Sequence, residues 1–316
     1  MIEMAYNLKE YAKKPERLAP GHRMCAGCGA PVIVRSILRG LKPEDHAVIA
    51  SATGCLEVCT YIYPYTAWED SFIHSAFENS AATLSGVEAA YTAMKRRGTL
   101  PTDKETKFIA FGGDGGTYDI GFQSLSGAME RGHDMVYVCY DNEAYMNTGT
   151  QRSSATPKYA ETSTTPVGSV RPGKLQFRKD LTKVMGSHQL PYVAQTACIG
   201  NFKDITEKAE KAIYTEGPCF LNVFSPCRGW GYKTEDMMLI NKLAVETKFW
   251  PLYEIVDGKY TVNYIPKETV PVSEFLKLQK RFKHLFKPGN EHLIEEIQAD
   301  VDRNWEALMD LASLNK

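Results

Sequence analysis

The chain has 316 residues, and its 37 Lys and Arg nearly balance its 38 Asp and Glu. This balance, with no run in which basic and aromatic residues alternate, predicts no nucleic-acid partner. Eight cysteines are too sparse for the disulfide framework of a small secreted domain, and the longest apolar runs are only strand-sized. The N-terminal residues contain no apolar stretch of signal-peptide length. We therefore expect a cytoplasmic protein without membrane contact.

Short apolar runs alternate with helical patterns between His46 and Cys227. The predicted strands are Ala47–Ser51, Lys107–Phe111, Met135–Tyr140, Tyr192–Thr196 and Phe220–Phe224. The predicted helices are Ser80–Arg97, Tyr118–Arg131, Phe177–Ser187 and Lys203–Glu216. This alternation is typical of an α/β fold with a doubly wound parallel sheet, in which ligands bind beyond the carboxyl ends of the strands.

The pattern changes near Trp250, which predicts a main domain at residues 1–250 and a helical C-terminal extension at residues 251–316. The extension carries one apolar helical stripe, which we expect to dock on the main domain or on another subunit: Leu293, Ile297, Val301, Trp305 and Leu308. Residues 142–174 have no periodicity and are rich in Ser, Thr, Pro and Gly. Such a long loop indicates a segment that covers a cofactor or contacts a partner, the alternative being a mobile surface loop.

A glycine-rich turn follows the second predicted strand, in the sequence F-G-G-D-G-G from Phe111 to Gly116. Glycines let backbone N–H groups approach phosphate oxygens, and Asp114 stands where a carboxylate binds Mg²⁺. One helix and one strand later, Asp141-Asn142 ends the next strand, so both turns are expected at the same edge of the sheet. The pair resembles the thiamine diphosphate fingerprint, which implies Mg²⁺ ligands at Asp114, Asn142 and the carbonyl of Ala144. Two ordinary strand-to-helix turns are the alternative.

Four cysteines form a second constellation: Cys25 and Cys28 in M-C-A-G-C-G, Cys55 in A-T-G-C, and Cys227 in S-P-C-R-G-W-G. From spacing alone, the C-x-x-C unit fits a thioredoxin-like pair, a zinc half-site or half of an iron–sulfur site. No second close pair completes a zinc site, and the single distant cysteines favour a four-thiolate cluster. Four further cysteines lie in apolar or helical segments and are interpreted as core or bystander thiols: Cys59, Cys139, Cys198 and Cys219.

Several longer motifs together resemble the β subunit of pyruvate:ferredoxin oxidoreductase and its relatives that act on other 2-oxo acids, including oxalate. They are M-C-A-G-C-G-A-P, A-T-G-C-L-E-V, I-Y-P-Y-T-A-W, H-S-A-F-E-N-S-A-A, A-F-G-G-D-G-G-T-Y-D-I-G and Y-D-N-E-A-Y-M-N-T-G-x-Q-R. The resemblance runs from about His22 to the C-terminus. It implies the thiamine diphosphate-binding fold, a bound thiamine diphosphate with Mg²⁺, and one [4Fe–4S] cluster held by Cys25, Cys28, Cys55 and Cys227.

The resemblance also implies roles for residues around the cofactor. Asn147 matches a family asparagine near the reacting carbon of the cofactor and is the candidate catalytic residue. The other residues expected to bind the cofactor are Gly113, Gly115, Gly116, Thr148, Gly149, Thr53 and His74. His74 is equally consistent with a buried structural histidine, and Glu78 is interpreted as a supporting residue.

In this family the reaction is oxidative decarboxylation of a 2-oxo acid, with electrons passing through the cluster to ferredoxin and the acyl group to coenzyme A. The resemblance implies an α subunit that carries the pyrimidine-binding domain, γ and δ subunits with further clusters on δ, and external ferredoxin. Pyruvate is the expected substrate, while oxalate, 2-oxoisovalerate and 2-oxoglutarate remain open. Two other classes stay in view, namely a non-catalytic electron-transfer subunit and a thiamine-dependent decarboxylase or synthase without redox chemistry.

Overall fold

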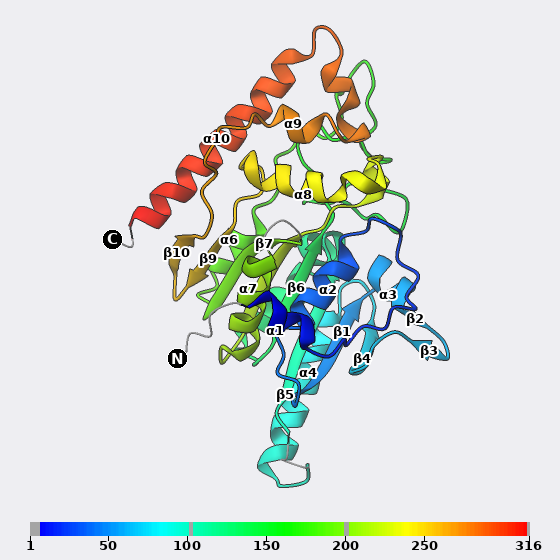
Figure 1. Cartoon of the computed structure of the whole chain (residues 1–316), viewed down its shortest axis with the longest axis vertical. Coiled ribbons are helices and arrows are strands. Elements are labelled where there is room, and N and C mark those ends of the chain that lie inside the picture. Colours follow the sequence, from blue (N-terminus) through cyan, green and yellow to red (C-terminus); the bar gives the residue numbers. More distant parts are fainter. Residues whose placement is uncertain (1–6, 101–103, 199–201, 315–316) are drawn as a thin grey trace.

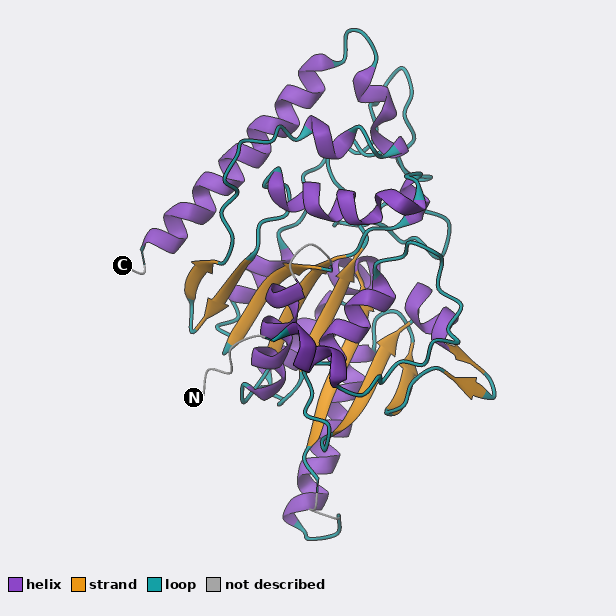
Figure 2. Ribbon diagram, in the orientation of Figure 1, coloured by secondary structure: helices purple, strands orange, loops and turns teal. Residues whose placement is uncertain are grey.

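An eight-stranded sheet forms the centre of the computed structural model, which describes residues 7–100, 104–198 and 202–314. Its strand order is β10-β9-β7-β8-β6-β5-β1-β4 (Figure 2). The strands from β7 to β4 pair in parallel, whereas β9 and β10 continue the other edge antiparallel. The bounds are β1 (His46–Ala52), β4 (Ser71–Ser75), β5 (Thr106–Gly113), β6 (Val136–Asp141), β7 (Tyr192–Ala197), β8 (Cys219–Phe224), β9 (Tyr253–Val256) and β10 (Lys259–Val262).

All five predicted strands are confirmed, each within one or two residues of its predicted bounds. Every residue of β6, β7 and β8 is buried, as expected for strands at the centre of a sheet covered on both faces. Strands β4, β9 and β10 were not predicted from the sequence, nor was a separate hairpin of β2 (Tyr61–Ile62) and β3 (Tyr65–Thr66). A signal for β9 and β10 was present, because Asp257-Gly258 joins them with φ angles of 48° and 77°. This is the two-residue turn typical of hairpins.

Helices cover both faces of the sheet, which confirms the doubly wound architecture (Figure 1). One face packs against α2 (Ala30–Leu38) and α7 (Phe202–Tyr214), and Ile33, Ile205 and Val138 of β6 belong to one buried cluster there. The other face packs against α4 (Ser80–Arg96), α5 (Phe122–Glu130) and α6 (Leu181–Gly186), with Tyr137 of β6 on that side. The remaining helices are α1 (Leu8–Lys13), α3 (Cys55–Thr60), η1 (Gly115–Ile120), η2 (Arg228–Trp230), η3 (Thr234–Asp236), α8 (Met237–Glu246), α9 (Ser273–Leu276), η4 (Lys280–Phe286) and α10 (Glu291–Ser313).

Two predicted helices differ from the structure at their N-terminal ends. The helix predicted from Tyr118 is preceded by a π-helical turn, η1, and α5 begins at Phe122 after Gly121. The helix predicted from Phe177 begins only at Leu181, because Asp180 caps it by accepting a hydrogen bond from the Lys183 N–H. Arg178, just before this cap, instead reaches Asp141 and Glu143 beneath the sheet edge. A long-range ion pair therefore overrides the local helical pattern.

The apolar stripe of α10 packs within the chain. Leu293, Ile297, Val301 and Leu308 are buried, and the first three join a cluster that includes residues of α9, η4 and the turn before β9. Trp305 is only partly buried, with the Lys248 ammonium 5.2 Å from its ring centroid. Among the described residues, no helix combines the length and apolar character needed to cross a membrane.

The loop between β6 and α6 contains neither helix nor strand, yet a buried lysine organises its interior. Lys174 Nζ donates to the carbonyl oxygens of Thr156, of Ser154 at 3.4 Å and of Phe177 at 3.4 Å. The pKa of the Lys174 amine is lowered from 10.5 to about 7, chiefly by burial and in smaller part by the nearby charge of Arg152. The loop is thus held by an ammonium group that burial makes costly to charge.

Replacing Lys174 by Met should change how stability depends on pH. Because the folded-state pKa is lowered, the unfolded chain binds more protons between pH 7 and 10.5, so the native chain gains stability as pH rises. We expect the free energy of unfolding of the native sequence to rise relative to that of Lys174→Met, by up to about 1.4 kcal/mol per pH unit. Denaturant titrations across this range measure the difference, with the exposed Lys259→Met as control. A difference that stays constant with pH would contradict this assignment.

Candidate cofactor sites

The carboxyl ends of β5 and β6 lie side by side, because Gly113 pairs with Tyr140 across the two strands. Asp114 directly follows β5, and Asn142 directly follows β6. The backbone N–H of Asn142 donates to Asp114 Oδ1 over 3.3 Å. The structure therefore brings together the two side chains that the sequence predicted to share a metal.

Three acceptor oxygens converge at these strand ends. The side-chain oxygen of Asn142 lies 2.8 Å from the carbonyl oxygen of Ala144 and 3.0 Å from Asp114 Oδ1. No proton lies between these oxygens, so either the amide turns over and its nitrogen donates to both, or a cation binds among them. Mg²⁺ prefers oxygen ligands of this kind. The residues present therefore fit the metal that the sequence predicted.

Asp114 is fully buried, and a negative charge at this position is costly. Burial raises the pKa of its carboxyl well above the ordinary value, and the neighbouring carboxyl of Asp141 raises it further. The Ser153 hydroxyl donates to Asp114 Oδ2 and opposes this rise. A bound Mg²⁺ would favour the ionised carboxylate, because an adjacent positive charge lowers a carboxyl pKa.

A small cavity of about 30 Å³, here called the cofactor cavity, opens beside these oxygens. Eight of the residues predicted to bind or act on the cofactor line it: Thr53, Gly113, Gly115, Gly116, Asn142, Ala144, Asn147 and Thr148. Its wall also contains residues that the sequence analysis did not single out, namely Phe77, Tyr140, Tyr145 and Met146. All four lie inside the quoted motifs, but only the fold reveals that their side chains reach one cavity.

Two glycines of this turn stand where a side chain would collide with neighbouring atoms. A Cβ on Gly115 would lie 2.4 Å from Tyr145 Cδ1, and one on Gly116 would lie 2.9 Å from the carbonyl oxygen of Phe77. Both distances are shorter than atoms tolerate, so these positions require glycine. The backbone here lies bare against the cavity, as the approach of a diphosphate group demands.

Three of the predicted cofactor residues are not part of the cavity wall: Asp114, His74 and Gly149. His74, in β4, has its Nε2 2.9 Å from Thr53 Oγ1 and 3.7 Å from Glu57 Oε2, so it meets the cavity only through Thr53. Gly149 lies in the following turn with φ of 114°. Glu78 is also outside the wall, and its Cα packs beside Gly121, where η1 passes into α5.

The four predicted cluster cysteines come from three separate turns. Cys25 and Cys28 close one turn through a 3.1 Å backbone hydrogen bond, with Gly27 between them at φ of 78°. The Gly29 N–H donates to the carbonyl oxygen of Pro226 over 3.1 Å, which joins this turn to the one that carries Cys227. Cys55 stands at the start of α3.

The thiols of these four cysteines are electrostatic neighbours. Burial raises the pKa of Cys28 to about 12, and Cys227, Cys55 and Cys25 contribute to that rise. Burial likewise raises the pKa of Cys55 to about 12 and of Cys227 to about 11. Crowded, buried thiols are costly to ionise unless a metal centre binds the thiolates.

These thiols do not form a site for a single ion. Among the residues that the structure describes, no group of three or more His, Cys, Asp or Glu side chains converges closely enough to hold one metal ion. In a cubane cluster each thiolate binds a different iron, so the four sulfurs need not meet at one point. Cys59 also lies near Cys25 and Cys55, whereas Cys139, Cys198 and Cys219 are buried in the core.

The cysteine group and the cofactor cavity share a wall. Cys55 lines the cavity, and its thiol lies 3.8 Å from Asn147 Oδ1. Met146, also in that wall, packs against the turn of Cys227, where a Cβ on Gly229 would lie 3.0 Å from the Met146 sulfur. A cluster and a cofactor bound at these two places would therefore be neighbours.

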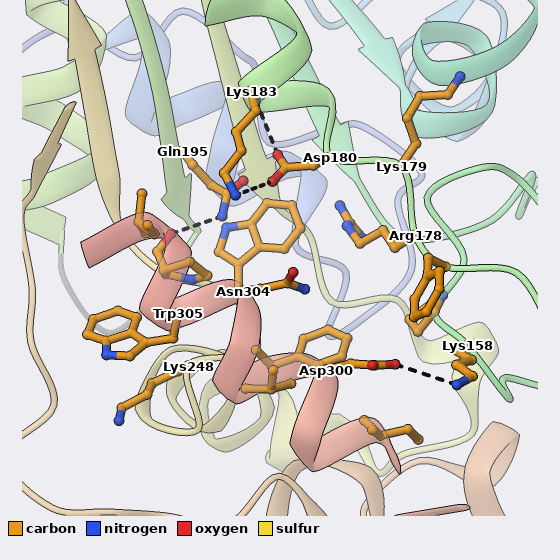
Figure 3. A pocket seen from close by; sticks show the side chains of 18 of the residues that line it. Lys158, Arg178, Lys179, Asp180, Lys183, Gln195, Lys248, Asp300, Asn304 and Trp305 are labelled. Carbon is orange, nitrogen blue, oxygen red and sulfur yellow. Dashed lines mark hydrogen bonds and ion pairs between the residues drawn. The ribbon is translucent and has the colours of Figure 1, made fainter. Parts of the chain in front are cut away.

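A larger cavity of about 140 Å³ lies beneath α10 and contains none of the predicted site residues (Figure 3). Ion pairs stand at its sides, with Lys158 Nζ 3.6 Å from Asp300 Oδ2 and Lys183 Nζ 3.2 Å from Asp180 Oδ2. Arg178 connects it to the cofactor site, because this side chain lines the cavity while its guanidinium pairs with Asp141 and Glu143. This pairing was not predicted from the sequence.

A family model described as thiamine pyrophosphate enzyme, C-terminal TPP binding domain, matches residues 52–223, from the end of β1 almost to the end of β8. Together with the fold, this match defines the chain as a thiamine pyrophosphate enzyme. The solved 2-oxoglutarate:ferredoxin oxidoreductase from Magnetococcus marinus has the same fold, with a TM-score of 0.57 and 23% identity. The match covers 74% of this chain and 72% of that one.

Curated relatives specify the family further. Pyruvate synthase subunit PorB of Thermotoga maritima is 50% identical over 320 residues, covering 99% of this chain and 98% of that protein. The PorB subunit of Methanocaldococcus jannaschii is 50% identical over 309 residues, covering 98% and 99%. Ketoisovalerate oxidoreductase subunit VorB of Pyrococcus furiosus is 40% identical over 319 residues, covering 99% of each. The chain belongs to this family of PorB and VorB subunits, which confirms the resemblance found in its motifs.

Replacing Asp114 by Ala should remove Mg²⁺-dependent binding of thiamine diphosphate, because the variant loses one of the three converging oxygens. The fold should survive, since the variant also loses a carboxyl that is costly to bury. Calorimetric titration with and without Mg²⁺ measures the affinity, and Asp302→Ala on the exposed face of α10 is the matched control. Unchanged Mg²⁺ dependence in Asp114→Ala would refute the metal assignment.

Proposed function

We propose that this chain is the diphosphate-binding, cluster-bearing β subunit of a 2-oxoacid:ferredoxin oxidoreductase that acts on pyruvate. The observation that carries the proposal is the shared wall of the two sites, where Cys55 lines the cofactor cavity and touches Asn147. A redox enzyme of this class needs its organic cofactor and its first electron acceptor close together. A decarboxylase or synthase without redox chemistry has no use for four thiols at this wall.

In this assignment the chain holds the cofactor from its diphosphate end. The backbone amides of Gly113, Gly115 and Gly116 approach the phosphates, while Asp114, Asn142 and the carbonyl of Ala144 bind Mg²⁺. Thr148 and Gly149 complete the turn, and Thr53, oriented by His74, borders the opposite side. Bound thiamine diphosphate supplies the chemistry that breaks the carbon–carbon bond of a 2-oxo acid.

The chain's side chains then orient the reaction and receive its electrons. Asn147 is the candidate catalytic residue, since its amide reaches from the cavity wall to the thiol of Cys55. Cys25, Cys28, Cys55 and Cys227 hold one [4Fe–4S] cluster. Phe77, Tyr140, Tyr145 and Met146 line the cavity with three aromatic rings and a thioether.

The remaining parts of the enzyme belong to partner subunits. We assign the pyrimidine-binding half of the thiamine site to an α subunit and the later electron relay to a δ subunit with ferredoxin-type clusters. A γ subunit belongs to the same complex. External ferredoxin accepts the electrons, and coenzyme A accepts the acyl group. Residues 1–250 form the cofactor domain and residues 251–316 the extension that closes over it, in a cytoplasmic complex.

A second substrate class is supported by the VorB relative, which is named for ketoisovalerate and matches 99% of this chain, as the Thermotoga maritima PorB subunit does. Oxalate, which would need no coenzyme A, is a further alternative within the same chemistry. The outcome depends on residues that contact the substrate carboxylate, which we assign to the α subunit.

The function is tested by anaerobic reduction of a viologen dye by the native complex purified through this chain. We expect pyruvate to support reduction that requires both thiamine diphosphate and coenzyme A, with 2-oxoisovalerate, 2-oxoglutarate and oxalate compared in parallel. Reduction by another acid alone would reassign the substrate. No reduction by any acid, in a complex that contains iron and thiamine, would refute the proposed activity.

Replacing Cys227 by Ser should destroy the [4Fe–4S] cluster or convert it to another cluster type, because one of four thiolates is lost. The rate of viologen dye reduction should fall by at least about 100-fold. Cys219→Ser is the matched control, since Cys219 begins β8, at the opposite end of the strand, and should leave the cluster unchanged. Iron analysis and electron paramagnetic resonance (EPR) measure the cluster. An unchanged signal in Cys227→Ser would move the fourth ligand to another thiol, such as Cys59.

A further inference from the structure

A buried arginine from the C-terminal part of the chain lies between the two proposed cofactor sites. Arg281, in η4, is 3% exposed, and its Nη2 donates to Glu143 Oε2. Its Nε and Nη1 have no hydrogen-bond partner. Its guanidinium carbon lies 4.1 Å from the ring centroid of Trp230 and 4.8 Å from that of Phe282. A fully desolvated cation with two unpaired N–H groups is an expensive feature to bury.

The first neighbour of Arg281 belongs to the metal-binding turn. Glu143 stands between Asn142 and Ala144, two of the proposed Mg²⁺ ligands, and has φ of 70°. A residue with a side chain rarely adopts this left-handed conformation, so surrounding contacts must hold it. Its carboxylate pairs with both Arg178, at 3.1 Å, and Arg281. The two arginines thereby fix the direction of the Ala144 carbonyl relative to the Asn142 side chain.

The second neighbour of Arg281 belongs to the cluster-binding turn. Trp230 closes the turn that begins at Cys227, with its backbone N–H 3.0 Å from the Cys227 carbonyl oxygen. The indole Nε1 of Trp230 donates to the carbonyl oxygen of Asn142 over 2.8 Å. One stacked pair, Arg281 on Trp230, therefore contacts both turns.

We propose that Arg281 is a positioning residue for both cofactors: it holds the Glu143 turn in the geometry that binds Mg²⁺ and thiamine diphosphate, and its buried charge makes the cluster easier to reduce. This inference rests on the proposed function. A cluster held by four thiolates is anionic, and an adjacent fixed cation stabilises its reduced form. The same residue thus favours cofactor binding and acceptance of the electrons that the cofactor releases.

The test uses the full complex with Arg281→Met, which removes the charge and keeps an apolar side chain, and Arg281→Lys, which keeps the charge without the planar fork. Calorimetry gives the affinity for thiamine diphosphate with Mg²⁺, and an EPR-monitored redox titration gives the reduction potential of the cluster. Arg303→Met, an exposed arginine of α10, is the matched control. Iron content and unfolding temperature are measured in parallel to identify loss of fold.

We expect Arg281→Met to bind Mg²⁺ and thiamine diphosphate about 10- to 100-fold more weakly and to shift the cluster potential to more negative values. Arg281→Lys should restore the potential but not the affinity. If Arg281→Met fails to assemble, the affinity and potential of Arg281→Lys decide the outcome. An unchanged affinity, or a potential that does not follow the charge at position 281, would overturn the proposal. Absence of iron and thiamine from the native complex would instead refute the proposed function.

Discussion

Crowded acceptor oxygens at the ends of β5 and β6 are the constraint on which the rest of the site depends. Asp114, Asp141 and Glu143 are all buried there, beside the carbonyl of Ala144 and the side chain of Asn142. Burial of carboxylates in this number is unfavourable unless cations compensate them. Arg178 and Arg281 pair with Asp141 and Glu143, but neither forms an ion pair with Asp114. A divalent ion among these oxygens, as in the proposed assignment, would complete the compensation and would account for an acid at the strand end with glycines around it.

The parallel sheet explains why two different cofactor sites can share a wall. Every parallel strand delivers its following turn to the same edge, so the turns after β1, β5, β6 and β8 gather there. Cys55 follows β1, the glycine turn follows β5, Asn147 follows β6, and Cys227 follows β8. The antiparallel strands β9 and β10 lie on the lateral side of the sheet next to β7 and lead into η4 and α10. Through η4 the chain returns, and Arg281 pairs with Glu143 in the turn after β6. The C-terminal part is therefore connected to the site by charge as well as by packing.

Sequence alone predicted the features that depend on local pattern. Continuous apolar runs gave the five central strands, and the glycine turn predicted to bind the cofactor does follow a strand, at the end of β5. Strands β4 and β10 were not predicted because they are short and partly exposed, and β9 was not predicted because a run of four residues has little periodicity. The pairing of Glu143 with Arg178 and Arg281 was invisible for another reason. Glu143 is separated from Arg178 by 35 positions in the sequence and from Arg281 by 138, and only the folded chain brings such distant side chains together. The misplaced start of α6 has the same origin, because Arg178 forms its distant ion pair instead of continuing a helix.

The adjacency of metal and cluster is the central claim, and it can be measured directly by replacing Mg²⁺ with Mn²⁺ in the anaerobic complex with thiamine diphosphate. Reducing the cluster should then broaden the EPR signal of Mn²⁺ and speed its relaxation, because two paramagnetic centres share one wall. The effect should disappear when the cluster is absent and the Mn²⁺ remains bound. A Mn²⁺ signal that is identical with the cluster oxidised, reduced or absent would place the two centres far apart and contradict the account.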